Sequence, residues 1–181
     1  MLAHLNTWAI ANVGPINFGV KYYVGRARPE EIAYKISKRE LSNVPLKLLQ
    51  MIPENSLPNA TSFTAYPKGS PMHPSWPAMH SAASVGSLWL AVVMNLSNEQ
   101  MCQAQLVDYG VAYARTVAGV HYASDNISGL RLGQKIIADK LPTYLNEIYG
   151  SNATAVEEKV QQVLLDWTTF LESDCYVSRM T

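Results

Sequence analysis

The sequence predicts an all-α protein, a helical bundle in which a long proline-rich loop precedes the central helix. Apolar residues recur at helical spacing over most of the chain, and no alternation of apolar and polar residues is long enough for a strand. Prolines crowd instead into residues 51–77, where with Gly69 they exclude a long helix and a central strand. The 181 residues fit a single domain, 1–181, and contain no fixed-period repeat.

The first helix is expected to start near Leu2, where apolar residues recur at helical spacing. Gly14-Pro15 is expected to kink or end it before helix resumes over 16–25. Pro29 suits the first turn of a second helix, and the two glutamates that follow complement the positive end of the helix dipole. Because seven residues make about two helical turns, Lys21 and Arg28 are expected to project to nearly the same side.

Residues 51–77 are the least helical part of the chain. Loops of this length in compact domains are commonly lids, binding loops or linkers. This one leads directly into HPSWPAMHS, in which proline-stiffened backbone presents His73, Trp76 and His80. We therefore interpret 51–77 as an active-site loop rather than a linker.

A buried helix is predicted from Ala78 to Leu96, with small residues that allow close packing. Ser97 and Gln100 form a capping-box pattern, which predicts another helix running towards Arg115. Gly119 should then break that helix or turn the chain.

Two further helices complete the predicted bundle. One runs from about Ser124 to Lys140 and should stop at Pro142. A second capping-box pattern, Thr154 with Glu157, predicts a last helix whose apolar stripe extends over 156–171.

Charge and composition limit the partners. Lys plus Arg number 14 and Asp plus Glu number 14, so no overall field draws the chain to nucleic acid or to an anionic membrane. The N-terminus lacks the pattern of a signal peptide, and the best membrane candidate, 78–96, contains His80 and several serines. We expect a soluble protein without a membrane span, in a compartment left open. Cys102 and Cys175 can pair or stay reduced.

Cationic and imidazole side chains recur in three blocks, K-x6-R-P, P-A-M-H and R-x5-H-x3-D. The blocks contain Lys21 and Arg28, then His80, and then Arg115, His121 and Asp125. Arginine holds tetrahedral oxyanions through two parallel hydrogen bonds. Three fixed cations would repel a transition-metal cation, and no carboxylate cluster accompanies them. The pattern therefore predicts a site for phosphate or a phosphate-like oxyanion.

These blocks resemble the signature K-x6-R-P, P-S-G-H and S-R-x5-H-x3-D of the superfamily that unites type 2 phosphatidic acid phosphatases, bacterial non-specific acid phosphatases and vanadium-dependent haloperoxidases. The resemblance implies a helical bundle of that type whose cofactor is vanadate, with phosphate able to occupy the same site. Its ligands would be Lys21, Arg28, Met79 through its N–H, Arg115 and His121.

The resemblance also implies roles for individual residues. His121 would attack phosphorus or ligate vanadium directly. His80 would act as acid or base on the apical oxygen, Asp125 would orient the imidazole of His121, and Lys21 would polarise bound peroxide.

The block HPSWPAMHS further resembles the H-P-S-Y-P-S-G-H of algal and cyanobacterial bromoperoxidases, and His73 falls at their extra active-site histidine. Phe18 stands where haloperoxidases often carry tryptophan, so the resemblance implies a halide pocket of His73, Trp76 and Phe18. The run AGVHYASDNISGLRLGQK is also similar to the haloperoxidase continuation. The implied function is vanadate-dependent oxidation of bromide or iodide by hydrogen peroxide, giving a hypohalous acid equivalent that halogenates a small organic acceptor.

Two alternatives stay open. A phosphomonoesterase that uses His121 as nucleophile and His80 as general acid is favoured by the modest spacing of the second and third blocks. A catalytically silent assembly module is favoured by Ala78, Met79 and Ala114, which replace two serines and a glycine of the signature. Known haloperoxidases are much longer, so the resemblance implies that the chain lacks several helices that wall their bundles. We therefore expect a minimal form or a fragment, and a homo-oligomer that covers exposed apolar faces.

Overall fold

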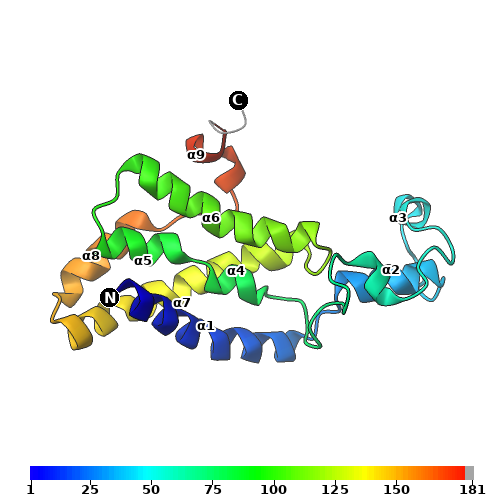
Figure 1. Cartoon of the computed structure of the whole chain (residues 1–181), viewed down its shortest axis with the longest axis horizontal. Helices are drawn as coiled ribbons and strands as arrows, with labels where there is room; N and C mark the ends of the chain where they lie inside the picture. The colour runs from blue at the N-terminus through cyan, green and yellow to red at the C-terminus, as the bar shows by residue number, and fades with distance from the viewer. Residues whose placement is uncertain (178–181) are drawn as a thin grey trace.

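The computed structural model describes residues 1–177, and within them the chain is helical without strands. The α-helices are α1 (Leu2–Val24), α2 (Pro29–Ser37), α3 (Leu46–Met51), α4 (Met79–Ala83), α5 (Gly86–Val93), α6 (Asn98–Val117), α7 (Ala123–Tyr149), α8 (Ala153–Val163) and α9 (Asp174–Val177). Two 3-10 turns, η1 (Ala60–Phe63) and η2 (Phe170–Glu172), complete the elements. Helices α1, α6, α7 and the pair α4 and α5 form an elongated bundle, and α2 and α3 lie at one end of it (Figure 1).

Helix α7 is the centre of the bundle, since it packs against α1, α4, α5, α6 and α8. Two glycines let the backbone of α4 lie directly on it. A Cβ at Gly129 would stand 2.4 Å from the carbonyl oxygen of Ala78, and one at Gly133 would stand 2.0 Å from that of Ala82. Both distances are far inside van der Waals contact, so only glycine permits this approach.

Neither Pro15 nor Pro142 ends its helix. The stop predicted at Pro142 was wrong, and of the kink or end predicted at Gly14-Pro15 the end does not occur. Helix α1 continues through Pro15, and α7 continues through Pro142. A proline inside a helix costs about 3 kcal/mol. In both helices, core residues are buried on each side of the proline, such as Val13 and Asn17 in α1 and Leu141 and Leu145 in α7. Tertiary packing therefore outweighs the local penalty.

The helix predicted over 78–96 is broken in two, between α4 and α5. Asp108 of α6 stabilises the start of α5. Its carboxylate accepts hydrogen bonds from the N–H groups of Gly86 (3.1 Å) and Ser87 (3.0 Å). Asp108 is almost fully buried, and this burial raises the pKa of its carboxyl to about 6. A side chain distant in sequence thus caps α5.

The C-terminal helix also differs from its prediction. Asn152, not Thr154, caps α8, and its side chain accepts the N–H of Ala155. The helix ends at Val163, yet Trp167 and Phe170 beyond it are still buried. Gln134 of α7 holds the following segment, since its side chain bonds both the N–H and the carbonyl oxygen of Leu165 and accepts the indole N–H of Trp167.

Three local predictions were confirmed. Pro29 is the first residue of α2, Ser97 and Gln100 make a reciprocal capping box at the start of α6, and Gly119 turns the chain with a φ of 72°. Cys102 and Cys175, whose state the sequence left open, form a disulfide that joins α6 to α9. Within residues 1–177, no helix combines the length and the hydrophobicity needed to cross a lipid bilayer.

Candidate functional site

The three sequence blocks meet at the end of the bundle that carries α2. Lys21 lies in the last turn of α1, Arg28 precedes α2, and Arg115 lies in the last turn of α6. The ends of α1 and α6 and the start of α7 come together at this end (Figure 1). We call Lys21, Arg28 and Arg115 the cationic cage.

Lys21 is completely buried at the floor of the cage. Its ammonium donates hydrogen bonds to the carbonyl oxygens of Pro74 (3.0 Å) and Ser75 (2.9 Å), which fixes the 73–77 loop to α1. Burial lowers the pKa of Lys21 to about 8, and the charge of Arg28 adds to this effect. A lysine with such a pKa gives up a proton more readily than an exposed one.

Arg28 connects the loop to the third block. Its guanidinium donates to the carbonyl oxygens of His73 and Val120, both at 2.9 Å, and it lies 3.2 Å from Nε2 of His121. Burial, followed by the charge of Arg115, lowers the pKa of Arg28. An arginine nevertheless stays charged, so the cage keeps its positive field.

Arg115 contacts a residue that the sequence blocks do not contain. Its guanidinium makes a short hydrogen bond with the phenolic oxygen of Tyr66, and the guanidinium carbon lies 5.1 Å from the centre of the Tyr66 ring. Within the described part of the chain, the Nε of Arg115 is buried without a hydrogen-bond partner. A buried donor left unpaired costs free energy, and an oxyanion in the cage would supply its acceptor.

His121 and Asp125 form a buried pair at the start of α7. Nδ1 of His121 lies 3.2 Å from Oδ2 of Asp125, and its Nε2 faces the donor Arg28. These partners assign the proton to Nδ1 and leave Nε2 unprotonated, with its electron pair directed towards Arg28. Burial lowers the pKa of His121 to about 4, although the hydrogen bond that His121 donates to Asp125 opposes this shift. His121 is therefore neutral at pH 7 and can act as a nucleophile or ligand.

His80 lies in α4, in the electrostatic field of the cage, but its side chain is exposed. Burial, followed by the charges of Arg115 and Arg28, lowers its pKa. Met79, which replaces a glycine of the signature, turns its side chain into the core, where a Cβ at Gly14 would lie 3.7 Å from its methyl group. The added bulk therefore packs against α1.

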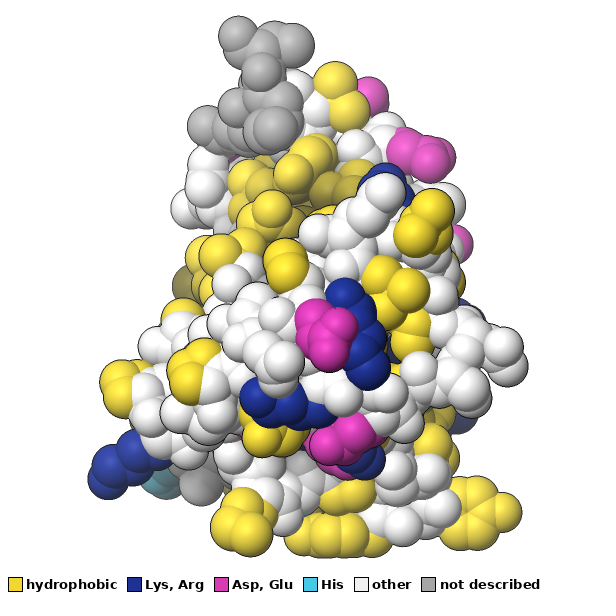
Figure 2. Space-filling view, turned by 90° about the vertical axis from the view of Figure 1, so that its right-hand side faces the viewer, with side chains coloured by type: hydrophobic (Ala, Val, Ile, Leu, Met, Phe, Trp, Pro, Cys, Tyr) yellow, Lys and Arg dark blue, Asp and Glu magenta, His cyan; other side chains and the backbone are white. Residues whose placement is uncertain are grey.

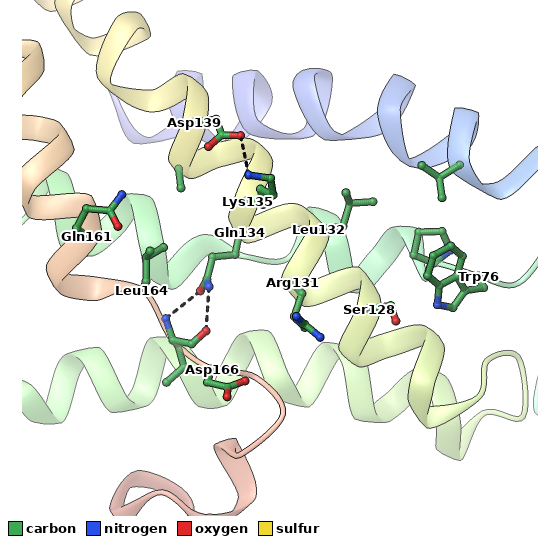
Figure 3. A pocket seen from close by; sticks show the side chains of 14 residues that line it. Trp76, Ser128, Arg131, Leu132, Gln134, Lys135, Asp139, Gln161, Leu164 and Asp166 are labelled. Atoms are coloured by element: carbon green, nitrogen blue, oxygen red, sulfur yellow. Dashed lines mark hydrogen bonds and ion pairs between the residues drawn. The ribbon is translucent and has the colours of Figure 1, made fainter. Parts of the chain in front are cut away.

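The three residues of the predicted halide pocket do not all come together. Phe18 packs edge-on against His73, with ring centres 5.1 Å apart, and Nδ1 of His73 lies 3.0 Å from the guanidinium of Arg28. Trp76 instead lines a separate cavity of about 920 Å³ between α1, α7 and the segment after α8. Figure 3 shows Trp76 at one end of that cavity, beyond Ser128 and Arg131.

The comparison with protein families agrees with this geometry. A sequence model of the PAP2 superfamily matches residues 2–138, which include all three blocks. The chain belongs to the PAP2 superfamily. Members of this superfamily are generally phosphatases or haloperoxidases, and their site binds phosphate or vanadate. A search of curated proteins and of solved structures finds no match for the chain.

Two residues around this PAP2 site were not predicted. Arg26 donates to Oδ1 of Asp125 at 2.7 Å, and its guanidinium carbon lies 4.2 Å above the ring of Tyr122. Tyr66 contacts Arg115 from the proline-rich segment. Neither residue belongs to the signature. One signal in the sequence pointed to Arg26, its position two residues before Arg28, and none pointed to Tyr66.

The donor set fits an oxyanion cofactor or substrate. Three cations are combined here with the unpaired Nε of Arg115 and the unprotonated Nε2 of His121, which lies 3.2 Å from Arg28. Within residues 1–177, no three His, Cys, Asp or Glu side chains gather where they could hold a metal cation. Phosphate and vanadate differ from such a cation because they are anions, which suit a group of fixed positive charges.

Proposed function

We propose that the protein is a vanadate-dependent haloperoxidase that uses hydrogen peroxide to oxidise bromide or iodide and so halogenates small organic acceptors. The observation that carries this proposal is the attachment of His73 to the cage. Its imidazole is held by Arg28 at 3.0 Å and packs against Phe18. Bare oxyanion binding requires neither contact, whereas a second imidazole and an aromatic ring beside the cage suit a halide site.

The residues of the cage bind and orient the oxyanion in this proposal. Lys21, Arg28 and Arg115 neutralise its charge, and His121 directs Nε2 at its central atom because Asp125 holds the proton on Nδ1. The side chain of His80 is exposed, and its lowered pKa keeps the imidazole unprotonated. His80 therefore accepts a proton from incoming hydrogen peroxide. When bound, vanadate supplies the Lewis-acid centre at which peroxide becomes able to oxidise halide.

A phosphomonoesterase is the second candidate, and the buried, neutral imidazole of His121 beside Asp125 favours it. His121 would attack phosphorus through Nε2 and form a phosphohistidine, while the bond to the leaving oxygen breaks. His80, reachable from solvent, would donate the proton that the departing alcohol needs. Water would then release phosphate from His121.

One experiment separates the candidates. The purified protein is assayed for bromination of phenol red with hydrogen peroxide and bromide, before and after addition of orthovanadate, and for hydrolysis of a phosphomonoester. His121→Ala removes the ligand or nucleophile, and His4→Ala is the matched control because His4 is exposed at the opposite end of α1 (Figure 1).

Vanadate-dependent bromination that survives in His4→Ala and disappears in His121→Ala supports the haloperoxidase. Hydrolysis that vanadate inhibits, without bromination, moves the assignment to a phosphomonoesterase. Inactivity in both assays overturns both and supports the silent assembly module that Ala78, Met79 and Ala114 suggest.

A further inference from the structure

A second cavity, of about 340 Å³, opens beside the cationic cage. It lies between α2, α3, η1 and the turn that joins α6 to α7. Its lining residues are Pro29, Ile32, Ala33, Ile36, Leu48, Ile52, Phe63, Thr116, Gly119, His121, Tyr122 and Ala123. Small-molecule sites in proteins commonly measure about 300–1,000 Å³, so this cavity suits a small organic group.

The wall of this apolar cavity is continuous with the cage. His121, the proposed nucleophile or ligand, lines the cavity, and its Nε2 lies 3.2 Å from Arg28 of the cage. Pro29 directly follows Arg28, and Thr116 directly follows Arg115. A molecule anchored at His121 therefore has apolar surface next to it on the same side of the protein.

The outer wall leaves apolar side chains partly exposed around this hollow. Helix α3 contains no fully buried residue, and Leu48 and Phe63 are each 39% exposed although both line the cavity. Figure 2 views this end of the molecule, where hydrophobic side chains lie between basic and acidic ones. The free energy falls when a ligand removes apolar surface from water, so these side chains favour the binding of an apolar group.

We propose that this cavity binds the uncharged aromatic group of the organic substrate, placing it beside an oxyanion held at His121. The inference rests on the proposed function and names the class of its organic substrate, aromatic compounds of one or two rings. The ring would belong to a free acceptor in the haloperoxidase and to the leaving group in the phosphomonoesterase. The chemistry that the cavity recognises is the same in both cases.

The test measures binding without turnover. The affinities of inorganic phosphate, methylphosphonate and phenylphosphonate are compared by calorimetry. Methylphosphonate reports on the cage alone, and phenylphosphonate adds the ring without a bond that the protein can hydrolyse. We expect phenylphosphonate to bind about tenfold more tightly or better, since the ring leaves water for an apolar wall.

Two double variants locate the effect. Leu48→Ser with Phe63→Ser removes apolar wall and should abolish the preference for phenylphosphonate while leaving the affinity for methylphosphonate unchanged. Leu46→Ser with Met51→Ser changes the same helix at residues that are 70% and 67% exposed and do not line the cavity. This control should keep the wild-type preference.

The outcomes distinguish the two proposals. If phosphate and methylphosphonate bind but the phenyl group adds no affinity, or if both double variants lose the preference equally, the aromatic-site inference is overturned and the oxyanion site stands. If neither anion binds, the proposed function fails. Binding of free phenol that only Leu48→Ser with Phe63→Ser weakens assigns the ring to an acceptor, whereas a gain confined to phenylphosphonate assigns it to an ester.

Discussion

The contact between α4 and α7 gives the sharpest stability prediction, Gly133→Ala. The new Cβ would lie 2.0 Å from the oxygen, 2.8 Å from the carbonyl carbon and 2.9 Å from the Cα of Ala82. All three are backbone atoms, so no side-chain rotation relieves the overlap and the two helices must separate. Overpacking of a core costs about 1–3 kcal/mol or more, and this overlap belongs at the upper end. Replacing a glycine inside a helix by alanine raises the free energy of unfolding by about 1 kcal/mol, because alanine has the higher helix propensity.

We therefore expect Gly133→Ala to lower the free energy of unfolding by about 2 kcal/mol, the difference between these two terms. For a chain of this size that corresponds to a fall in Tm of about 4–8 °C. Gly110→Ala on α6 is the matched control, because a Cβ there would meet nothing within 4 Å. It should raise the free energy of unfolding by up to about 1 kcal/mol.

Urea and thermal denaturation of the three proteins provide the measurement. If Gly133→Ala is as stable as Gly110→Ala, the backbones of α4 and α7 do not lie as close together as the structure shows, and the reasoning is refuted. The same contact bears on the site, because Gly129 lies against the carbonyl oxygen of Ala78, just before Met79 and His80.

Three further predictions follow from the buried charges. Asp108→Ala leaves the first two N–H groups of α5 without an acceptor and should lower the free energy of unfolding by about 2–4 kcal/mol. The measurement is urea denaturation at pH 8, where the wild-type carboxyl is ionised. A loss smaller than that of Asp139→Ala, at an exposed aspartate, would contradict the capping role. Arg26→Ala removes the cation from Asp125, so the pKa of His121 should rise in a histidine NMR titration, and an unchanged or lower value would refute the coupling. Because burial lowers the pKa of His121 to about 4, below the ordinary value of 6.5, the unfolded chain takes up a proton between these pH values before the folded chain does. That contribution to stability is complete above pH 6.5 and is lost as the pH falls towards 4, on the order of 3 kcal/mol. His121→Gln should remove this part of the acid dependence of unfolding.

Local signals predicted those features that depend on neighbouring residues. Pro29 begins α2, Ser97 and Gln100 cap α6, and Gly119 turns the chain before α7. In each case the residue satisfies or withholds a backbone hydrogen bond within a few positions. The pair of His121 and Asp125, which the family resemblance implied, is local as well, because Asp125 in the first turn of α7 also accepts the N–H of Tyr122, the residue next to His121.

Distant residues decided the rest. The sequence predicted a kink or an end at Pro15 and a stop at Pro142, but both helices continue because residues on both sides of each proline are buried. It predicted one helix over 78–96, but Asp108 makes a break possible by supplying acceptors from another helix. Nothing near Arg115 indicates that Tyr66 contacts it.

The sequence by itself determined which chemistry to expect, because the type and spacing of Lys21, Arg28, Arg115 and His121 predict a site for an oxyanion. Only the tertiary structure decided the environment of that cage: Arg26 on Asp125, the direction of the Met79 side chain and the apolar cavity beside His121. The physical reason is that backbone capping and helix spacing act over a few residues, whereas burial and charge act between groups that only packing brings together.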